Sequence, residues 1–326
     1  MVAILILNWN GYKDTIACIK SIFQSKETDF FVVVGDNGSC DDSIEKIYDY
    51  FYSANLKIIK EQINKEKMDH VDCGNIIIYD MKTNQGFARG NNLMIKYARR
   101  FSPDHYFLLN NDTEVTSHFL SSLLSFRRKN PQYDVLAPLI PFYYEKDKIW
   151  NAGGKQFWGF RKYYYESKNI SAVKERAFIK CTFLTGCAML VSEKCMTKEG
   201  NLFTECFFFG EEDFELSRRL RKQHIRMACV LDSIVYHKVS SSSNKFASYD
   251  KIFIHYLNRY IDNRKNLSRL SFACWRLVNN IYLYYLLRKC FVKSQVNSLI
   301  KEINIECQLH NGVSKNYFER RMGKKG

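Results

Sequence analysis

Residues 1–39 have the sequence MVAILILNWNGYKDTIACIKSIFQSKETDFFVVVGDNGS. Two apolar, β-branched runs, at residues 2–7 and 30–35, flank residues 15–24, whose apolar side chains recur every three or four positions. This alternation is typical of a strand, a helix and a second, parallel strand. The stretch therefore predicts a βαβ unit at the start of an α/β domain.

The same alternation continues to about residue 140. It predicts further strands at residues 75–79, 105–109 and 133–137, and further helices at residues 42–53, 90–99 and 117–126. This order favours a mainly parallel sheet flanked by helices. From about residue 150 to residue 192, aromatic-rich runs around Gly153 and Gly154 indicate a mixed, antiparallel extension of the sheet.

The composition is that of an ordered globular protein. The 326 residues are 46% hydrophobic and include only four prolines, which argues against long disordered linkers. The eleven cysteines never form a Cys-x-x-Cys pair, so neither a disulfide framework nor a zinc site is indicated. We expect a cytoplasmic protein, because the first apolar run lacks the basic leader and cleavage site of a signal peptide.

Most of the formal charge of +15 lies at the end of the chain. Residues 245–326 contain sixteen Lys or Arg and five Asp or Glu, a net charge of +11. We place a domain boundary at the serine run 240–243, between a domain over residues 1–240 and a basic, aromatic-rich helical extension over residues 241–326. No transmembrane helix is expected, because the most apolar candidate, residues 272–292, is interrupted by charged residues.

Polar residues follow three of the predicted strands. They are Asn8-Trp9-Asn10-Gly11, Asp36-Asn37-Gly38-Ser39 and Asn110-Asn111-Asp112. In open α/β sheets, ligands bind outside the carboxyl ends of the strands, so we expect these loops to meet in one cleft. Such residues are also ordinary in turns and helix caps, but three loops of this kind favour a binding site.

These loops belong to a longer ordered series of motifs. The series continues with Asn84-Gln85-Gly86-Phe87-Ala88, Gly90-Asn91-Asn92, Gly186-Cys187-Ala188 and Glu212-Asp213. Over residues 2 to about 240 the chain resembles glycosyltransferase family 2, and within it the rhamnosyltransferase-like branch. The resemblance implies a GT-A-type fold, with a donor-binding half to about residue 115 and an acceptor half over residues 116–240.

The resemblance also implies an activity. It is an inverting transfer of a sugar from a nucleotide diphosphate donor, dTDP-rhamnose or a UDP-sugar, to a glycan or lipid-linked acceptor in cell-surface polysaccharide synthesis. Because the diphosphate leaving group gains negative charge, a divalent cation, Mn²⁺ or Mg²⁺, is the natural stabiliser. The transfer is therefore expected to depend on a metal.

Two residues are predicted as metal ligands. Asp112 follows a strand end, and the resemblance places it at the last Asp of an Asp-x-Asp motif whose first Asp is replaced here by Asn110. His237 follows the apolar run 233–236, and the resemblance places it near the metal and the diphosphate. Oxygen ligands and an imidazole suit Mn²⁺ at least as well as Mg²⁺. A hydrogen-bonded, structural histidine is the alternative for His237.

The acidic run 211–213 follows Phe207-Phe208-Phe209-Gly210. An inverting transfer needs a carboxylate beside the acceptor hydroxyl. Asp213 is the predicted base, because the resemblance places the Asp of the family's Glu-Asp pair there, and Glu212 is expected to orient the acceptor or Asp213. The alternative is an acidic first helical turn, with Glu215 paired to Arg219.

Donor binding is assigned to the early loops. Asp36 is expected to accept hydrogen bonds from the base or ribose, Gly86 to allow close approach of a ligand, and Arg89 to meet phosphate. An exposed arginine at a plain helix start is the alternative for Arg89. The predicted donor-binding residues are Asn8, Asn10, Gly11, Asp36, Asn84, Gly86, Arg89, Asn110 and Asn111.

The basic C-terminal region predicts amphipathic helices, in which Ile252, Tyr256 and Tyr260 recur every four residues. Such helices are expected to contact the cytoplasmic face of a membrane, to pack on the first domain or to form a homodimer contact.

Three other classes of protein remain as alternatives. A relative that binds the donor without turnover is an alternative because Asn110 replaces the first Asp of the Asp-x-Asp motif. The basic C-terminal region would suit a nucleic-acid-binding protein, but this function would not explain the three polar loops. We therefore expect no nucleic acid partner. A nucleotidyltransferase needs a basic phosphate-binding loop where this chain has only Lys13.

Overall fold

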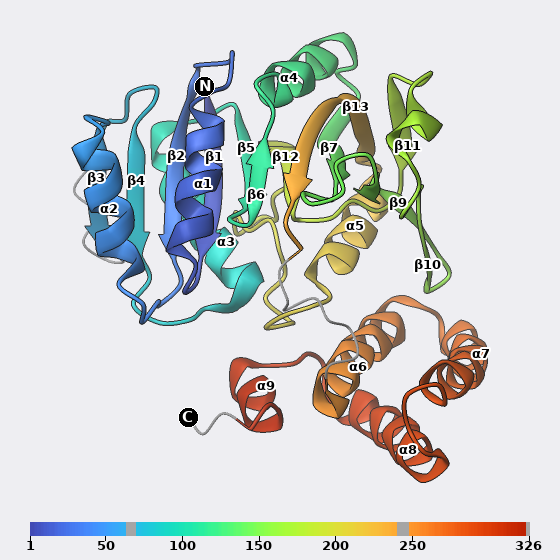
Figure 1. The fold of residues 1–326 in the computed structure, drawn as a ribbon. Helices are drawn as coiled ribbons and strands as arrows, with labels where there is room; N and C mark the ends of the chain where they lie inside the picture. Colours follow the sequence, from blue (N-terminus) through green and yellow to red (C-terminus); the bar gives the residue numbers. More distant parts are fainter. Residues whose placement is uncertain (63–69, 240–247, 324–326) are drawn as a thin grey trace.

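The structure is a computed structural model that describes residues 1–62, 70–239 and 248–323 (Figure 1). Within these residues an 11-stranded sheet has the order β11-β13-β7-β12-β5-β1-β2-β4-β3, with β6 and β8 added at β13 and β7. Its strands are β1 (Val2–Asn8), β2 (Phe30–Asp36), β3 (Ile58–Gln62), β4 (Ile76–Asp80), β5 (His105–Asn110), β6 (Thr113–Val115), β7 (Tyr133–Pro141), β8 (Ile149–Asn151), β11 (Phe178–Cys181), β12 (Ala188–Ser192) and β13 (Arg226–His237).

The strand directions divide the sheet into two parts. Strands β3, β4, β2, β1 and β5 are parallel. Beyond them β12 is antiparallel to β5 and β7, while β7 and β13 are parallel to each other. A separate hairpin consists of β9 (Gly154–Phe157) and β10 (Phe160–Tyr163). The predicted mixed, mainly parallel sheet is confirmed.

Helices cover both faces of the sheet. They are α1 (Tyr12–Ile22), α2 (Ser43–Ser53), α3 (Gly86–Ala98), α4 (Phe119–Lys129) and α5 (Glu212–Lys222), with short 3₁₀ turns at Arg99–Phe101, Ile170–Val173 and Glu193–Cys195. Side chains of β1 alternate between the faces. Ala3 and Leu5 share a core with α3 and α5, whereas Ile4 and Ile6 share another core with α1, α2 and α4.

Four helices follow the last strand and share a core with Phe207, from the segment before α5, and Val313. They are α6 (Tyr249–Asn266), α7 (Arg269–Leu287), α8 (Lys293–Leu309) and α9 (Lys315–Arg321). Figure 1 shows them beyond the edge of the sheet at which β1, β2 and β4 end. The predicted boundary at residues 240–243 lies outside the described residues. In the described ranges, no helix is both long and apolar enough to span a bilayer.

Polar contacts join these helices to the sheet domain. The Arg218 guanidinium on α5 forms an ion pair with Asp262 on α6, at 2.9 Å, and donates to Asn263 Oδ1 at 2.8 Å. Asn258 on α6 also donates to the carbonyl of Phe209, at 2.9 Å. The buried polar residues of α6 therefore contact both α5 and the segment just before it.

Candidate active site

Side-chain hydrogen bonds hold the three predicted loops together. Asn8 Nδ2 donates to Asp36 Oδ1 at 2.8 Å, which joins the loops after β1 and β2. Asn111 Nδ2 donates to Thr15 Oγ1 at 3.1 Å, and Thr15 Oγ1 donates to Asn8 Oδ1 at 2.8 Å. The loops after β1, β2 and β5 therefore meet at one edge of the sheet, as the sequence predicts.

The carboxylate of Asp36 is occupied within the protein. It is fully buried, and both of its oxygens accept hydrogen bonds from Ser39, at 2.7 Å from the hydroxyl and 2.9 Å from the backbone N–H. With the bond from Asn8, Asp36 thus fixes the shape of two loops. Its contact with a base or a ribose stays a prediction.

Asn37, which is not among the predicted site residues, connects the second loop to α3. Its Oδ1 accepts the backbone N–H of Gln85 at 2.7 Å, and its Nδ2 donates to Asn84 Oδ1 at 3.1 Å. Asn84 Oδ1 also accepts the N–H of Gly86 at 2.9 Å. In the sequence, Asn37 was indicated by its position inside a polar loop that follows a strand.

Gly86 approaches another part of the chain. It has a φ of +77°, and a Cβ atom there would lie 2.5 Å from the carbonyl oxygen of Phe208. The glycine is therefore required for packing α3 against the aromatic run before the acidic turn. The predicted close approach of a ligand at Gly86 stays a prediction.

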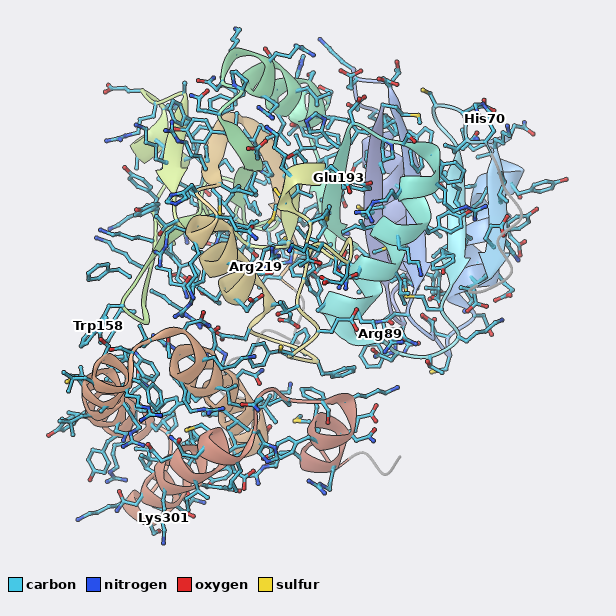
Figure 2. The ribbon with its side chains drawn as sticks, turned by 180° about the vertical axis from the view of Figure 1, so that it is seen from behind. His70, Arg89, Trp158, Glu193, Arg219 and Lys301 are labelled. Atoms are coloured by element: carbon cyan, nitrogen blue, oxygen red, sulfur yellow. The ribbon has the colours of Figure 1, made fainter. Side chains whose placement is uncertain are left out.

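The other predicted donor residues line the same edge. Asn10 has a φ of +51° and accepts the N–H of Cys40, and a Cβ on Gly11 would lie 2.6 Å from Asn111 Nδ2. The backbone N–H of Asn110 donates to the carbonyl of Cys187 at 2.8 Å, which links β5 to the segment before β12. Arg89 is exposed and lies 4.0 Å from a carboxylate oxygen of Glu205 (Figure 2).

The two predicted metal ligands, 125 residues apart in sequence, are in contact. His237 Nε2 lies 3.1 Å from Asp112 Oδ1, and both side chains are largely buried. The antiparallel pairing of β6 with β13 places them together, because Thr113 faces His237. Trp150 packs edge-on against the imidazole, at 4.3 Å between ring centroids. Within the described chain, His237 Nδ1 is buried without a hydrogen-bond partner.

This pair fits part of the coordination shell of a divalent cation. Two ligands about 2.1 Å from a metal on adjacent corners of an octahedron are roughly 3 Å apart, close to the observed separation of 3.1 Å. Among the described residues no group of three or more His, Cys, Asp or Glu could hold a metal. Mg²⁺ and similar ions often take only one or two carboxylates from the protein and their other ligands from phosphates and water.

The acidic turn lies at the start of α5. Asp213 is half-buried; its Oδ2 accepts from Thr185 Oγ1 at 3.2 Å, and the backbone of Gly186 also bonds to it. Desolvation raises the pKa of Asp213 to about 6, although these hydrogen bonds lower it. Glu212 accepts the N–H of Gly210 at 2.6 Å, and burial raises its pKa to about 7. Within the described residues, Glu212 Oε1 is buried without a partner.

The structural alternative for this turn is met in part, because Glu212, Asp213 and Glu215 do lie in the first turn of α5. Glu215 accepts from Thr204 Oγ1 at 2.8 Å. Arg219 instead donates to the backbone carbonyls of Cys195 and Leu202. Arg219 therefore joins α5 to the loop before it, and its charge also opposes the rise that burial causes in the pKa of Glu215.

Glu211, which the sequence did not single out, is held by residues from two other elements. Its fully buried carboxylate forms an ion pair with Arg161 on β10. The Arg161 guanidinium lies over the ring of Phe214, at 3.4 Å from the centroid. Arg259 on α6 donates to the carbonyl of Gly159 at the tip of the same hairpin. Burial raises the pKa of Glu211, and Arg161 opposes this rise.

The segment Gly186-Cys187 connects the two halves of the site. Cys187 accepts the backbone N–H of Asn110, two residues before Asp112. Gly186 lies against the base candidate, because a Cβ there would be 2.7 Å from Asp213 Oδ1. Burial raises the pKa of the Cys187 thiol, and the carboxylates of Asp112 and Asp213 raise it further, so both carboxylates lie near this short segment.

A mainly parallel α/β sheet with polar loops and carboxylates at its strand ends is typical of proteins that bind a ligand at this edge. The family model described as "Glycosyltransferase like family 2" matches residues 65–252, and the chain belongs to this family. No curated protein matches the chain. The rhamnosyltransferase-like branch stays a prediction.

Solved structures confirm the predicted GT-A-type fold. The mannosyltransferase PcManGT from Pyrobaculum calidifontis, in complex with GDP-Man and Mn²⁺, matches with a TM-score of 0.58 and 10% identity, over 99% of this chain and 83% of that chain. GalNAc-T7, with UDP, GalNAc and Mn²⁺, matches with a TM-score of 0.56 and 14% identity, over 99% of this chain and 56% of that chain. The present chain thus spans little more than half of GalNAc-T7.

Proposed function

We propose that the protein transfers a sugar from a nucleoside diphosphate donor to a hydroxyl of a glycan or lipid-linked acceptor, with inversion at the sugar C1. The observation that carries this proposal is the presence of two carboxylate sites near Gly186-Cys187. One site holds Asp112 beside His237 at 3.1 Å, and the other holds Asp213, whose pKa is raised to about 6.

The base side of the site explains the acceptor chemistry. The ionised carboxylate of Asp213 takes the proton of the acceptor hydroxyl as that oxygen bonds to C1 from the face opposite the diphosphate. The bond from C1 to the diphosphate breaks, and the nucleoside diphosphate leaves with its electron pair. Glu212 is proposed to hold the acceptor, because its buried Oε1 has no hydrogen-bond partner among the described residues.

The other side of the site is proposed to receive the donor diphosphate. A divalent cation held by Asp112 and His237 supplies positive charge to the leaving group when it is bound. Lys238, next to His237, forms ion pairs with Asp14 at 2.9 Å and Glu114 at 3.2 Å, which keeps the chain after β13 at this edge. The donors proposed from the resemblance are dTDP-rhamnose and UDP-sugars, and Mn²⁺ is the proposed ion.

Release of nucleoside diphosphate from a panel of dTDP-, UDP- and GDP-sugars, in the presence of added glycan and lipid-linked acceptors, tests the proposal. With Mn²⁺ we expect release from one donor, and we expect kcat/KM to rise with pH to a plateau, with a midpoint near pH 6. The sign follows from the base: only ionised Asp213 accepts a proton, and its pKa is raised to about 6.

The other outcomes separate the alternatives. Nucleotide binding without release from any donor would identify a binding-only relative. Salt-sensitive binding of oligonucleotides, without nucleotide binding, would favour the nucleic-acid class instead. Release that falls as the pH rises through the pKa of Asp213 would exclude this carboxylate as the base.

A further inference from the structure

One face of α7 is apolar and exposed to solvent along its whole length. Leu270, Leu277, Ile281 and Tyr285 recur at helical spacing and are 75%, 64%, 53% and 69% exposed. Val278 and Tyr282 widen this stripe. The opposite face of α7 is already buried, through Phe272, Trp275, Asn279, Leu283 and Leu287. A helix that is apolar on both sides is normally covered on both.

The charges around α7 all have one sign. No Asp or Glu occurs between Asp262 and Glu302, whereas eight Lys or Arg do. They are Arg264, Lys265, Arg269, Arg276, Arg288, Lys289, Lys293 and Lys301. Arg269, Arg288 and Lys289, at the two ends of α7, are exposed, and Lys301 on α8 projects from the helical unit (Figure 2).

These charges decide between the surfaces that could cover the stripe. A second copy of this chain would bring two basic rims together, which is electrostatically unfavourable. A nucleic acid would set phosphates and water against apolar side chains and leave the stripe without an apolar partner. An anionic lipid surface offers both parts, because its phosphates attract Lys and Arg while its acyl region accepts Leu, Ile and Val.

We propose that α7 docks flat on an anionic membrane. The stripe of Leu270, Leu277, Val278 and Ile281 enters the boundary between headgroups and acyl chains. Tyr282 and Tyr285 lie at headgroup depth, where tyrosine is favoured. Arg269, Arg288 and Lys289 contact lipid phosphates at the two ends of the helix. This docking does not depend on sugar transfer and is tested without a donor or an acceptor.

Co-sedimentation of the full chain with vesicles tests the docking. We expect binding to vesicles of phosphatidylcholine and phosphatidylglycerol in a ratio of about 7 to 3, and much weaker binding to phosphatidylcholine alone, because basic residues are attracted to an anionic lipid surface. The double variant Leu277→Ser/Ile281→Ser is expected to weaken this binding by at least about tenfold, since it removes most of the buried apolar area.

Two further variants separate the parts of the surface. Arg288→Gln/Lys289→Gln should weaken binding to the anionic vesicles and leave the weak binding to phosphatidylcholine unchanged. The control Tyr52→Ser/Tyr144→Ser removes exposed rings, 64% and 79% exposed, from α2 and from the segment after β7, and should bind like the wild type. All of these positions are exposed, so a melting temperature near that of the wild type is expected and confirms folding.

Three outcomes would overturn the proposal. They are equal binding to neutral and anionic vesicles, binding that the α7 variants do not change, and self-association without lipid that Leu277→Ser/Ile281→Ser abolishes. The last outcome would assign the stripe to a second copy of the chain.

Discussion

Replacement of Asp213 by asparagine is expected to lower kcat by about 10²–10⁴-fold, the usual contribution of a general base. Asparagine has nearly the same shape, and its carbonyl oxygen can still accept the hydrogen bond from Thr185 Oγ1, which is 3.2 Å in length. The side chain no longer takes a proton from the acceptor. Steady-state kinetics of nucleoside diphosphate release should therefore show a large fall in kcat with little change in KM for the donor.

A second variant displaces the base without removing it. In Gly186→Ala the new methyl group would lie 2.7 Å from Asp213 Oδ1 and 3.0 Å from the ring of Phe87, so the carboxylate must shift although it is still present. We expect a smaller fall in kcat and a modest cost in stability, about 1–3 kcal/mol. The neighbouring change Cys187→Ala is the control and should retain most of the activity. An Asp213→Asn enzyme with undiminished kcat would refute the assignment of the base.

Replacement of Arg218 by methionine is expected to lower the free energy of unfolding by about 3–5 kcal/mol, because it leaves a buried carboxylate without its partner. Arg218 and Asp262 are 5% and 1% exposed, and their ion pair at 2.9 Å joins α5 to α6. Burial lowers the pKa of Arg218, with Asp262 opposing this effect. Urea denaturation should show a large shift of the midpoint.

Two further variants test whether the loss of stability comes from the buried ion pair. The double variant Arg218→Met/Asp262→Leu should recover much of the lost stability, since the pair is then replaced by apolar side chains. Lys222→Met, one turn further along α5, removes an exposed hydrogen bond of 2.8 Å to Asn266 and should cost at most about 1 kcal/mol. A loss of similar size in Lys222→Met and Arg218→Met would mean that the buried pair has no special role.

Local patterns in the sequence predicted the sheet and the position of the site. The apolar run before Asn8 and the one before Asp36 are ended by turn residues, and such signals depend only on neighbours in sequence. In open α/β sheets, ligands bind outside the carboxyl ends of the strands. This rule then predicted that the loops meet at one edge of the sheet. Strand β3 was missed because it is short and lies at the edge of the described sheet, beside β4, and because Lys60 and Glu61 interrupt its apolar run.

Contacts between distant elements were beyond the sequence pattern. Glu211 is held by Arg161 on β10, and nothing near either residue in sequence indicates that the hairpin packs against the acidic turn. The packing of Phe208 against Gly86 is likewise a contact that no local pattern indicates. The proximity of Asp112 and His237 was expected from the family resemblance, and the pairing of β6 with β13 supplies its physical basis.

The most direct test of the central claim is the Mn²⁺-dependent thermal stabilisation of the protein by nucleoside diphosphates, compared between the wild type and Asp112→Asn. A ligand that binds only the native state raises the melting temperature. We predict a shift with one nucleotide that requires Mn²⁺, that persists in the control Asp104→Asn and that is lost in Asp112→Asn. Asp104 is a suitable control because it lies before the start of β5, paired with the chain terminus. An equal shift in Asp112→Asn, or no shift with any nucleotide, would contradict the proposed donor site.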